Sequence, residues 1–248
     1  MSNLNLHNLL IIDAENNHQP LENFSIKSSN SSFETFNVLF RNQEEELIKI
    51  INEFKNGAIF GCVAWLTAVP ILKALSKCSN VQIIVQKEDF LRPDTSTRNI
   101  NSWESNLRKL YNDVTCSLDR YQFKKPISEL SICGEITVEG IRCVGNHNSN
   151  HQSAFPRSHH KFLVFCTLDK EIPNSWEPRY KAVGVWTGSF NLTKNATQSF
   201  ENVLYFIDAS GDNQIINFFL REHHQIFTIS EQLDWEKSWS TPEFRIST

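Results

Sequence analysis

The sequence has no long hydrophobic run, no paired cysteine motif and no excess of basic residues. The longest apolar run near its N-terminus is Leu9 to Ile12, so we expect a cytoplasmic protein without a secretory signal or membrane insertion. Its six cysteines are scattered without a C-x-x-C pair, which favours buried free thiols over a disulfide framework. A formal net charge of −4 excludes a general basic field for nucleic-acid binding, so any basic groove must be local.

Apolar residues are plentiful, at 40% of 248 positions, and can form one continuous core. Residues 1–35 are predicted to be a short strand followed by a loose segment rich in Asn, Ser, Glu and Gln. No long Gly, Pro or Ser linker divides the rest, so we expect residues 36–248 to form a single domain.

Hydrophobic periodicity predicts a succession of strands and helices. An apolar strand over 57–65, a helix over 67–78 and a second strand over 81–85 predict a right-handed parallel crossover. Further strands are expected at 136–144, 161–166, 182–187 and 202–207, and further helices at 43–54, 102–113 and 212–227. The expected fold class is α/β, with a mixed β-sheet flanked by helices on both faces.

A histidine pair and a lysine precede one of these strands. Side chains alternate along a strand, so His159 and Lys161 share one face, whereas His160 points to the other. This alternation selects His159 as the reactive histidine. His160 is expected to pack or form hydrogen bonds behind the strand.

A second polar pair follows the strand near residue 187. Ser189 and Asn191 share a face there, and Glu201 opens the next strand. Lysine, serine and asparagine can hold phosphoryl oxygens while a histidine attacks or transfers a proton. Glu201 is expected to accept a hydrogen bond from the second ring nitrogen of His159. The predicted catalytic residues are therefore His159, Lys161, Ser189, Asn191 and Glu201.

These three segments resemble known motifs. His159-His160-Lys161, Gly188-Ser189-Phe190-Asn191 and Glu201-Asn202 resemble, in order, the H-x-K, G-S-x-N and E-N elements of the phospholipase D superfamily. The likeness is strongest to its small, single-motif nucleases. It implies that residues 36–248 form a phospholipase D-like catalytic domain.

The resemblance implies a hydrolase that needs no cofactor or metal and works through a phosphohistidine intermediate. Because this chain carries only one motif, it implies a homodimer in which two copies share one site. The family pattern places an aspartate where this sequence has Cys166, which puts activity in question. Such domains recur in restriction and anti-phage systems, so protein partners of that kind fit the resemblance.

The leading hypothesis is a nuclease, because the small single-motif layout is typical of one and a local basic groove is compatible with an acidic net charge.

 The substrate would be DNA or RNA, held in that groove by basic and aromatic side chains rather than by the net charge of the chain. The residues expected to contact it are Arg157, Trp176, Arg179, Lys181 and Lys194, together with Trp186.

Two alternative functions remain open. A lipid phosphodiesterase fits the motif, although no amphipathic basic helix or lipidation motif would bring it to a bilayer. A catalytically impaired nucleic-acid-binding module fits the loss of aspartate at position 166. His147 and His151 have the spacing of a metal-binding pair, but no second pair follows, so no metal is expected. His223 and His224 are expected on a helix surface, and Trp65 and Trp103 in the core or at its rim.

Overall fold

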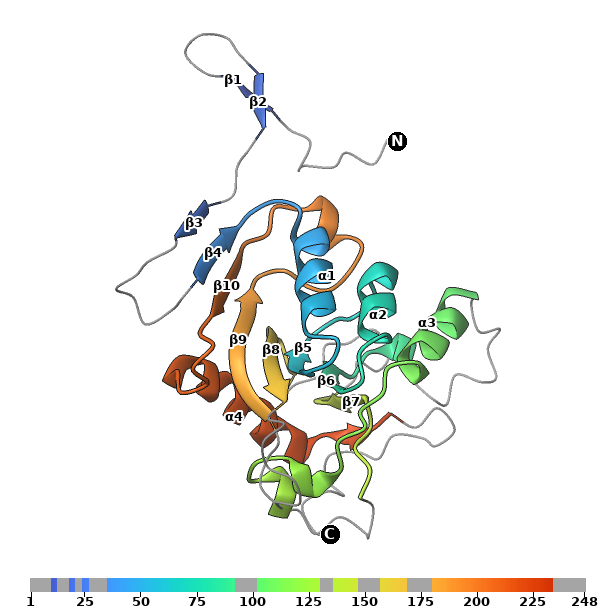
Figure 1. Cartoon of the computed structure of the whole chain (residues 1–248). Helices are drawn as coiled ribbons and strands as arrows, with labels where there is room; N and C mark the ends of the chain where they lie inside the picture. The colour runs from blue at the N-terminus through green and yellow to red at the C-terminus, as the bar shows by residue number, and fades with distance from the viewer. Residues whose placement is uncertain are drawn as a thin grey trace.

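The computed structural model describes residues 10–12, 18–20, 24–26, 35–91, 102–129, 136–146, 157–168 and 180–233. One mixed sheet of nine strands organises these residues, in the order β11-β7-β6-β5-β8-β9-β10-β4-β3 (Figure 1). Strands β5, β6 and β7 are parallel to one another, and each remaining neighbouring pair is antiparallel. The strands of this sheet are β3 (Phe24–Ile26), β4 (Thr35–Leu39), β5 (Ala58–Val63), β6 (Val81–Gln86), β7 (Ile141–Val144), β8 (Lys161–Leu168), β9 (Tyr180–Gly188), β10 (Val203–Ile207) and β11 (Glu231–Gln232).

The N-terminal segment contains more strand than the sequence predicted. Strands β1 (Leu10–Ile12) and β2 (His18–Pro20) pair with each other in a separate two-stranded sheet. Strand β3 then joins the edge of the main sheet by pairing with β4. Part of the segment expected to be a loose connection is therefore strand.

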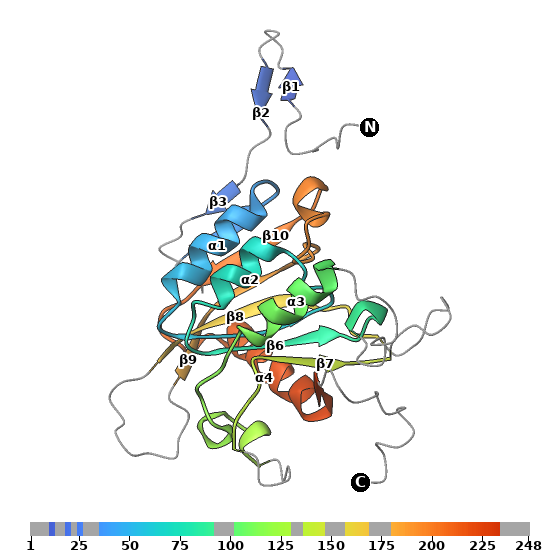
Figure 2. The same ribbon diagram turned by 90° about the vertical axis from the view of Figure 1, so that its right-hand side faces the viewer.

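Helices cover both faces of the sheet, as the sequence predicted. Helices α1 (Gln43–Glu53), α2 (Val69–Leu75) and α3 (Ser102–Asn112) lie on one face, and α4 (Gln214–Ile229) lies on the other (Figure 2). Short 3-10 helices lie at Asp89–Leu91, Arg120–Gln122, Ile127–Glu129 and Ala196–Gln198. The expected α/β fold class is confirmed. None of the described helices is both long and apolar enough to cross a membrane.

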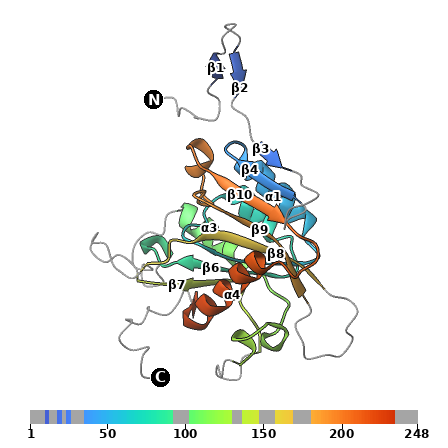
Figure 3. The same ribbon diagram turned by 90° about the vertical axis from the view of Figure 1, so that its left-hand side faces the viewer.

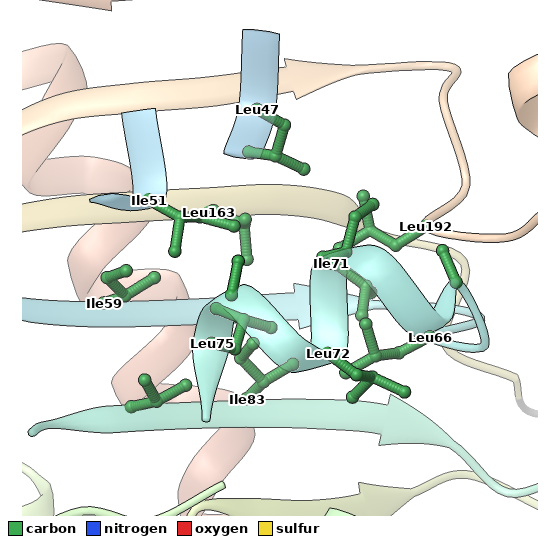
Figure 4. Close-up of a cluster of buried hydrophobic side chains, with 14 of the residues drawn as sticks. Leu47, Ile51, Ile59, Leu66, Ile71, Leu72, Leu75, Ile83, Leu163 and Leu192 are labelled. Carbon is green, nitrogen blue, oxygen red and sulfur yellow. The ribbon is translucent and has the colours of Figure 1, made fainter. Parts of the chain in front are cut away.

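The core beneath α1 and α2 is built from aliphatic side chains. Leu47 and Ile51 of α1 meet Leu163 of β8, while Leu72 and Leu75 of α2 lie over the central strands (Figure 4). Strands β5 and β6 are buried along their whole length because helices cover both of their faces. The apolar run of β5 and the largely apolar sequence of β6 are thus explained by their central position, and the parallel pairing predicted from the strand, helix, strand succession is confirmed.

The core beneath α4 corrects the prediction for two histidines. His223 and His224 were expected on a helix surface, but both are buried. They belong to α4, which lies against the sheet (Figure 3). Tyr180 and the His224 Nε2 atom lie 2.9 Å apart, and His223 contacts Gln82 on β6. Burial lowers the pKa of His223 to about 3, so both rings can be accommodated uncharged.

The strand expected over 136–144 is shorter than predicted. Strand β7 begins only at Ile141, because the preceding residues turn to a neighbouring loop. Thr137 bridges to Asp119, and the Arg120 backbone N–H donates to the carbonyl oxygen of Ile136 at 2.7 Å. Ile136 and Thr137 therefore pair with this loop instead of extending strand β7.

Candidate active site

The predicted catalytic residues come from strand ends that meet at one edge of the sheet. Lys161 opens β8 opposite Val63, the last residue of β5. Gly188 ends β9 opposite Val203, the first residue of β10. Since β5 and β6 run parallel, the residues after β6 reach the same edge.

His159 and Lys161 lie side by side at this edge. The Lys161 ammonium is 3.1 Å from Nδ1 and 3.2 Å from Nε2 of His159. It also donates to the His159 carbonyl oxygen at 3.1 Å. The alternation expected from the sequence therefore brings an imidazole and an ammonium together.

His160 points to the opposite face. Its ring packs against Phe162 at a centroid distance of 5.6 Å, and its Nε2 lies 3.6 Å from Glu222 of α4. Its backbone carbonyl accepts from the Ala64 N–H at 2.7 Å, which ties the segment to the end of β5. His160 thus packs behind the strand, as the alternation predicted.

Ser189 and Glu201 form a hydrogen-bonded pair. The Ser189 hydroxyl donates a short hydrogen bond to Glu201 Oε2 and accepts from the Asn202 backbone N–H at 3.0 Å. Gly188 is required beside them, because a Cβ atom there would overlap the carbonyl oxygen of Asn202. The sequence predicted Glu201 as the acceptor for His159, whereas its described hydrogen bond comes from Ser189.

Glu201 is held from a second direction by helix α1. The buried side chain of Gln43 donates through Nε2 to the Glu201 carbonyl oxygen at 3.0 Å.

Asn191 lines a pocket beside Glu201. Its Oδ1 atom is buried without a hydrogen-bond partner among the described residues.

The electrostatics of the site favour a neutral imidazole. Partial burial lowers the pKa of His159, and the nearby charges of Lys161 and Arg157 lower it further. Burial also lowers the pKa of Lys161, although the Glu201 carboxylate opposes this change. A neutral histidine keeps a lone pair that can attack phosphorus.

Gln86, which ends β6, and Glu88, which follows it, anchor the catalytic segment and were not singled out in the sequence. Gln86 Oε1 accepts from the Ser158 N–H at 2.6 Å, directly before His159. Glu88 pairs closely with Arg157 and accepts from Trp65 Nε1 at 2.9 Å. The signal that could have found them is their position after a predicted parallel strand, since such strand ends meet at one edge.

The residues expected to bind substrate are not all brought together. Lys194 is exposed and lines the pocket beside Asn191, while Arg157 is paired with Glu88. Lys181 lies near the other end of β9, about 26 Å from Ser189 at the usual rise per strand residue. Trp186, expected to line the groove, is instead buried in the core. Trp176 and Arg179 lie outside the described residues.

The metal-binding pair weighed in the sequence also lies outside the described residues. This applies to both His147 and His151. Within the described ranges, no group of three or more His, Cys, Asp or Glu side chains has an arrangement suited to a metal ion.

Cys166 lies away from the catalytic edge. It is buried within the core beneath α4, five residues along β8 from Lys161, which corresponds to about 17 Å. It pairs with Ala58, at the opposite end of β5 from the site. Position 166, where the family has an aspartate, is therefore not part of the cluster formed by His159, Lys161, Ser189 and Glu201.

We expect Cys166→Ala to leave catalysis almost unchanged. At this separation the two sites should be independent, so kcat/KM on an oligonucleotide should stay within about twofold of the unmodified protein. Removing the buried Sγ atom should lower the free energy of unfolding by about 1 kcal/mol, measurable by urea denaturation. A large loss of kcat with stability retained would show that position 166 acts on the site.

This chain has a relative among curated proteins. It is 31% identical over 226 residues to uncharacterized protein L381 of Acanthamoeba polyphaga mimivirus, an alignment that covers 85% of this chain and 73% of that protein. A comparison with models of protein families gives no match.

Solved structures give partial overlaps. Nuc, a phospholipase D family member from Salmonella typhimurium, aligns with 83% of this chain and 98% of its own, at 18% identity and a TM-score of 0.45. NucT from Helicobacter pylori aligns with 79% of this chain and 98% of its own, at 14% identity and a TM-score of 0.42. Polyphosphate kinase from Porphyromonas gingivalis aligns with 81% of this chain and 28% of its own, at 10% identity and a TM-score of 0.44. With every TM-score below 0.5, these overlaps alone indicate no function.

Proposed function

This chain belongs to the same family as uncharacterized protein L381 of Acanthamoeba polyphaga mimivirus, and from its site we propose a metal-independent phosphodiesterase of the phospholipase D type, acting in the cytoplasm as a nuclease on DNA or RNA. The observation that carries this proposal is the contact of the Lys161 ammonium with the His159 imidazole, 3.1 Å from Nδ1. The Ser189–Glu201 pair lies at the same edge of the sheet. The three motif elements resemble those of the phospholipase D superfamily in residues and order.

The proposed reaction proceeds by two displacements. A ring nitrogen of His159 attacks the phosphorus, and the bond from phosphorus to the leaving oxygen breaks as a second histidine gives that oxygen a proton. Water then attacks the phosphohistidine, gives its proton to the second histidine and releases His159. Lys161 and Asn191 stabilise the negative charge on the phosphoryl oxygens, and Ser189 and Glu201 hold the edge in place.

A homodimer supplies the second histidine. The chain has one H-x-K motif, and His159 is exposed at the edge of the sheet. Two-fold symmetry can therefore bring the same face of a second copy against it. Light scattering should give a mass of about two 28.7 kDa chains for the active species, and an active species of one chain would contradict the shared site.

The reaction is tested by offering purified protein several phosphodiesters in the presence of a chelator. The substrates are single-stranded DNA, duplex DNA, RNA and phosphatidylcholine vesicles. Cleavage of nucleic acid that persists with the chelator is expected, because His159 and Lys161 supply the chemistry. Cleavage that stops with the chelator would contradict the metal-independent reaction, and cleavage of lipid alone would indicate a lipid phosphodiesterase. Binding of nucleic acid without cleavage would indicate a binding module of a larger, defence-type assembly.

A further inference from the structure

A pocket beside the proposed catalytic residues extends beyond the groups that the two displacements use. Its volume is about 710 Å³, within the range of small-molecule binding sites. Aromatic side chains line one part of it and polar side chains the other. Its aromatic lining is Trp65, Phe90 and Trp103, and its polar lining includes Asn106, Asn191, Thr193, Lys194, Asn195 and Ser199.

The pocket adjoins the site directly. Asn191 and Glu201 contribute to its wall. The Trp65 ring, on the same wall, meets the His159 ring edge-to-face at a centroid distance of 6.4 Å. A group held in the pocket is therefore next to a phosphate attacked by His159, and on a nucleic acid that group is a base of the adjoining nucleotide.

Two tryptophans leave their rings open at this pocket. Trp65 is 37% exposed and Trp103 is 49% exposed, and the Trp103 ring lies 5.6 Å from that of Phe90. Helix α3 packs on the core through Leu107 and Leu110, so Trp103 is not needed to attach the helix. Exposed aromatic rings beside a phosphodiester site are suited to stacking on a base, since every base has a π-face.

The charges and polar groups favour a nucleotide over a quaternary ammonium headgroup. An aromatic cage for such a cation works best with an unpaired carboxylate. Here Glu88 is paired with Arg157, and Glu201 accepts from Ser189 beside Lys161. The wall instead offers amides and hydroxyls that can form hydrogen bonds to base edges.

From these contacts, and resting on the proposed function, we infer that the pocket binds one unpaired nucleobase next to the scissile phosphate. A base in a duplex is already paired and stacked, and must be flipped out at a cost in free energy before it can enter. The enzyme therefore prefers single-stranded over duplex nucleic acid. Lys194, exposed on the pocket wall, contacts the neighbouring backbone phosphate.

The test combines Trp103 variants with an abasic substrate. Binding is followed by the fluorescence anisotropy of a labelled single-stranded oligonucleotide, with His159→Ala in all proteins so that no cleavage occurs. Trp103→Ala should weaken binding by about five- to a hundredfold, the usual effect of losing one base–aromatic stack, and Trp103→Phe should retain most of the affinity. An oligonucleotide that lacks the base at the scissile position should bind weakly both to the protein with Trp103 and to Trp103→Ala. The loss of affinity from removing the base and the loss from removing the ring should therefore not add.

A matched control removes an exposed aromatic ring elsewhere. Phe218 is 61% exposed on α4, across the sheet from the pocket, and Phe218→Ala should not change binding. Equal losses in Trp103→Ala on the intact and abasic oligonucleotides would overturn the base-binding role. So would phosphatidylcholine cleavage that depends on Trp103 in proteins that keep His159, if oligonucleotide binding does not depend on Trp103. Because binding is measured without turnover, an absence of phosphodiester cleavage would refute the proposed function and leave this test interpretable.

Discussion

Replacing His159 with alanine should abolish phosphodiesterase activity, lowering kcat by about 10⁴-fold or more while the fold is kept. The imidazole supplies both the nucleophile and, from a second copy, the acid, so its loss removes both displacements. Its side chain is exposed at the edge of the sheet and supports none of the core. Single-turnover cleavage of a labelled oligonucleotide measures the loss, and circular dichroism checks the fold.

His160→Ala is the matched control, since it deletes the same side chain one residue away. His160 packs on Phe162 and lies near Glu222, on the face away from the site. Its variant should cleave at close to the unmodified rate. Activity that survives in His159→Ala but disappears in His160→Ala would show that the strand alternation assigned the reactive histidine to the wrong face.

Replacing Lys161 with glutamine should both slow the reaction and move its dependence on pH. Loss of a charged donor to the phosphoryl oxygens should lower kcat by about 10²- to 10³-fold. The attacking His159 must be neutral and the acid from the second copy protonated, so kcat/KM follows a bell-shaped pH profile whose ascending limb reports loss of the proton from the attacking ring. Burial and the charge of Lys161 hold the pKa of His159 below the usual histidine value. Without the lysine charge the pKa rises, and the ascending limb of the profile moves to higher pH.

The control for this shift is Lys194→Gln, which removes an equal charge from the pocket wall. Lys194 is absent from the charges that lower the pKa of His159, so its variant should weaken substrate binding and leave the ascending limb in place. Profiles of kcat/KM on one oligonucleotide, measured across the acid and neutral range, compare the two variants. A limb that stays in place in Lys161→Gln would contradict a direct electrostatic role for Lys161.

Much of the catalytic edge could be predicted from the sequence, because its order depends on local periodicity. Alternation along one strand separated His159 from His160 and joined His159 to Lys161. Apolar residues at 57–65 and 81–85 predicted two buried strands, and the helix expected between them predicted that the two strands run parallel. Both features follow from neighbours along the chain.

Contacts between distant segments were decided only by the tertiary structure. His223 resembles a surface histidine in a helix, yet the sheet buries it. Glu201 was assigned to His159, but its carboxylate meets Ser189, because the pairing of β9 with β10 sets which side chains face each other.

The pocket beside the catalytic residues also could not be predicted from the sequence. Trp65, Glu88 and Trp103 are separated along the chain and carry no shared motif, but the ends of β5 and β6 and the start of α3 bring them to one wall. Cys166 is the converse case, since a motif position that looks close to Lys161 in sequence lies near the far end of the strand. Periodicity determined which residues share a face, and packing of the whole chain determined which faces meet.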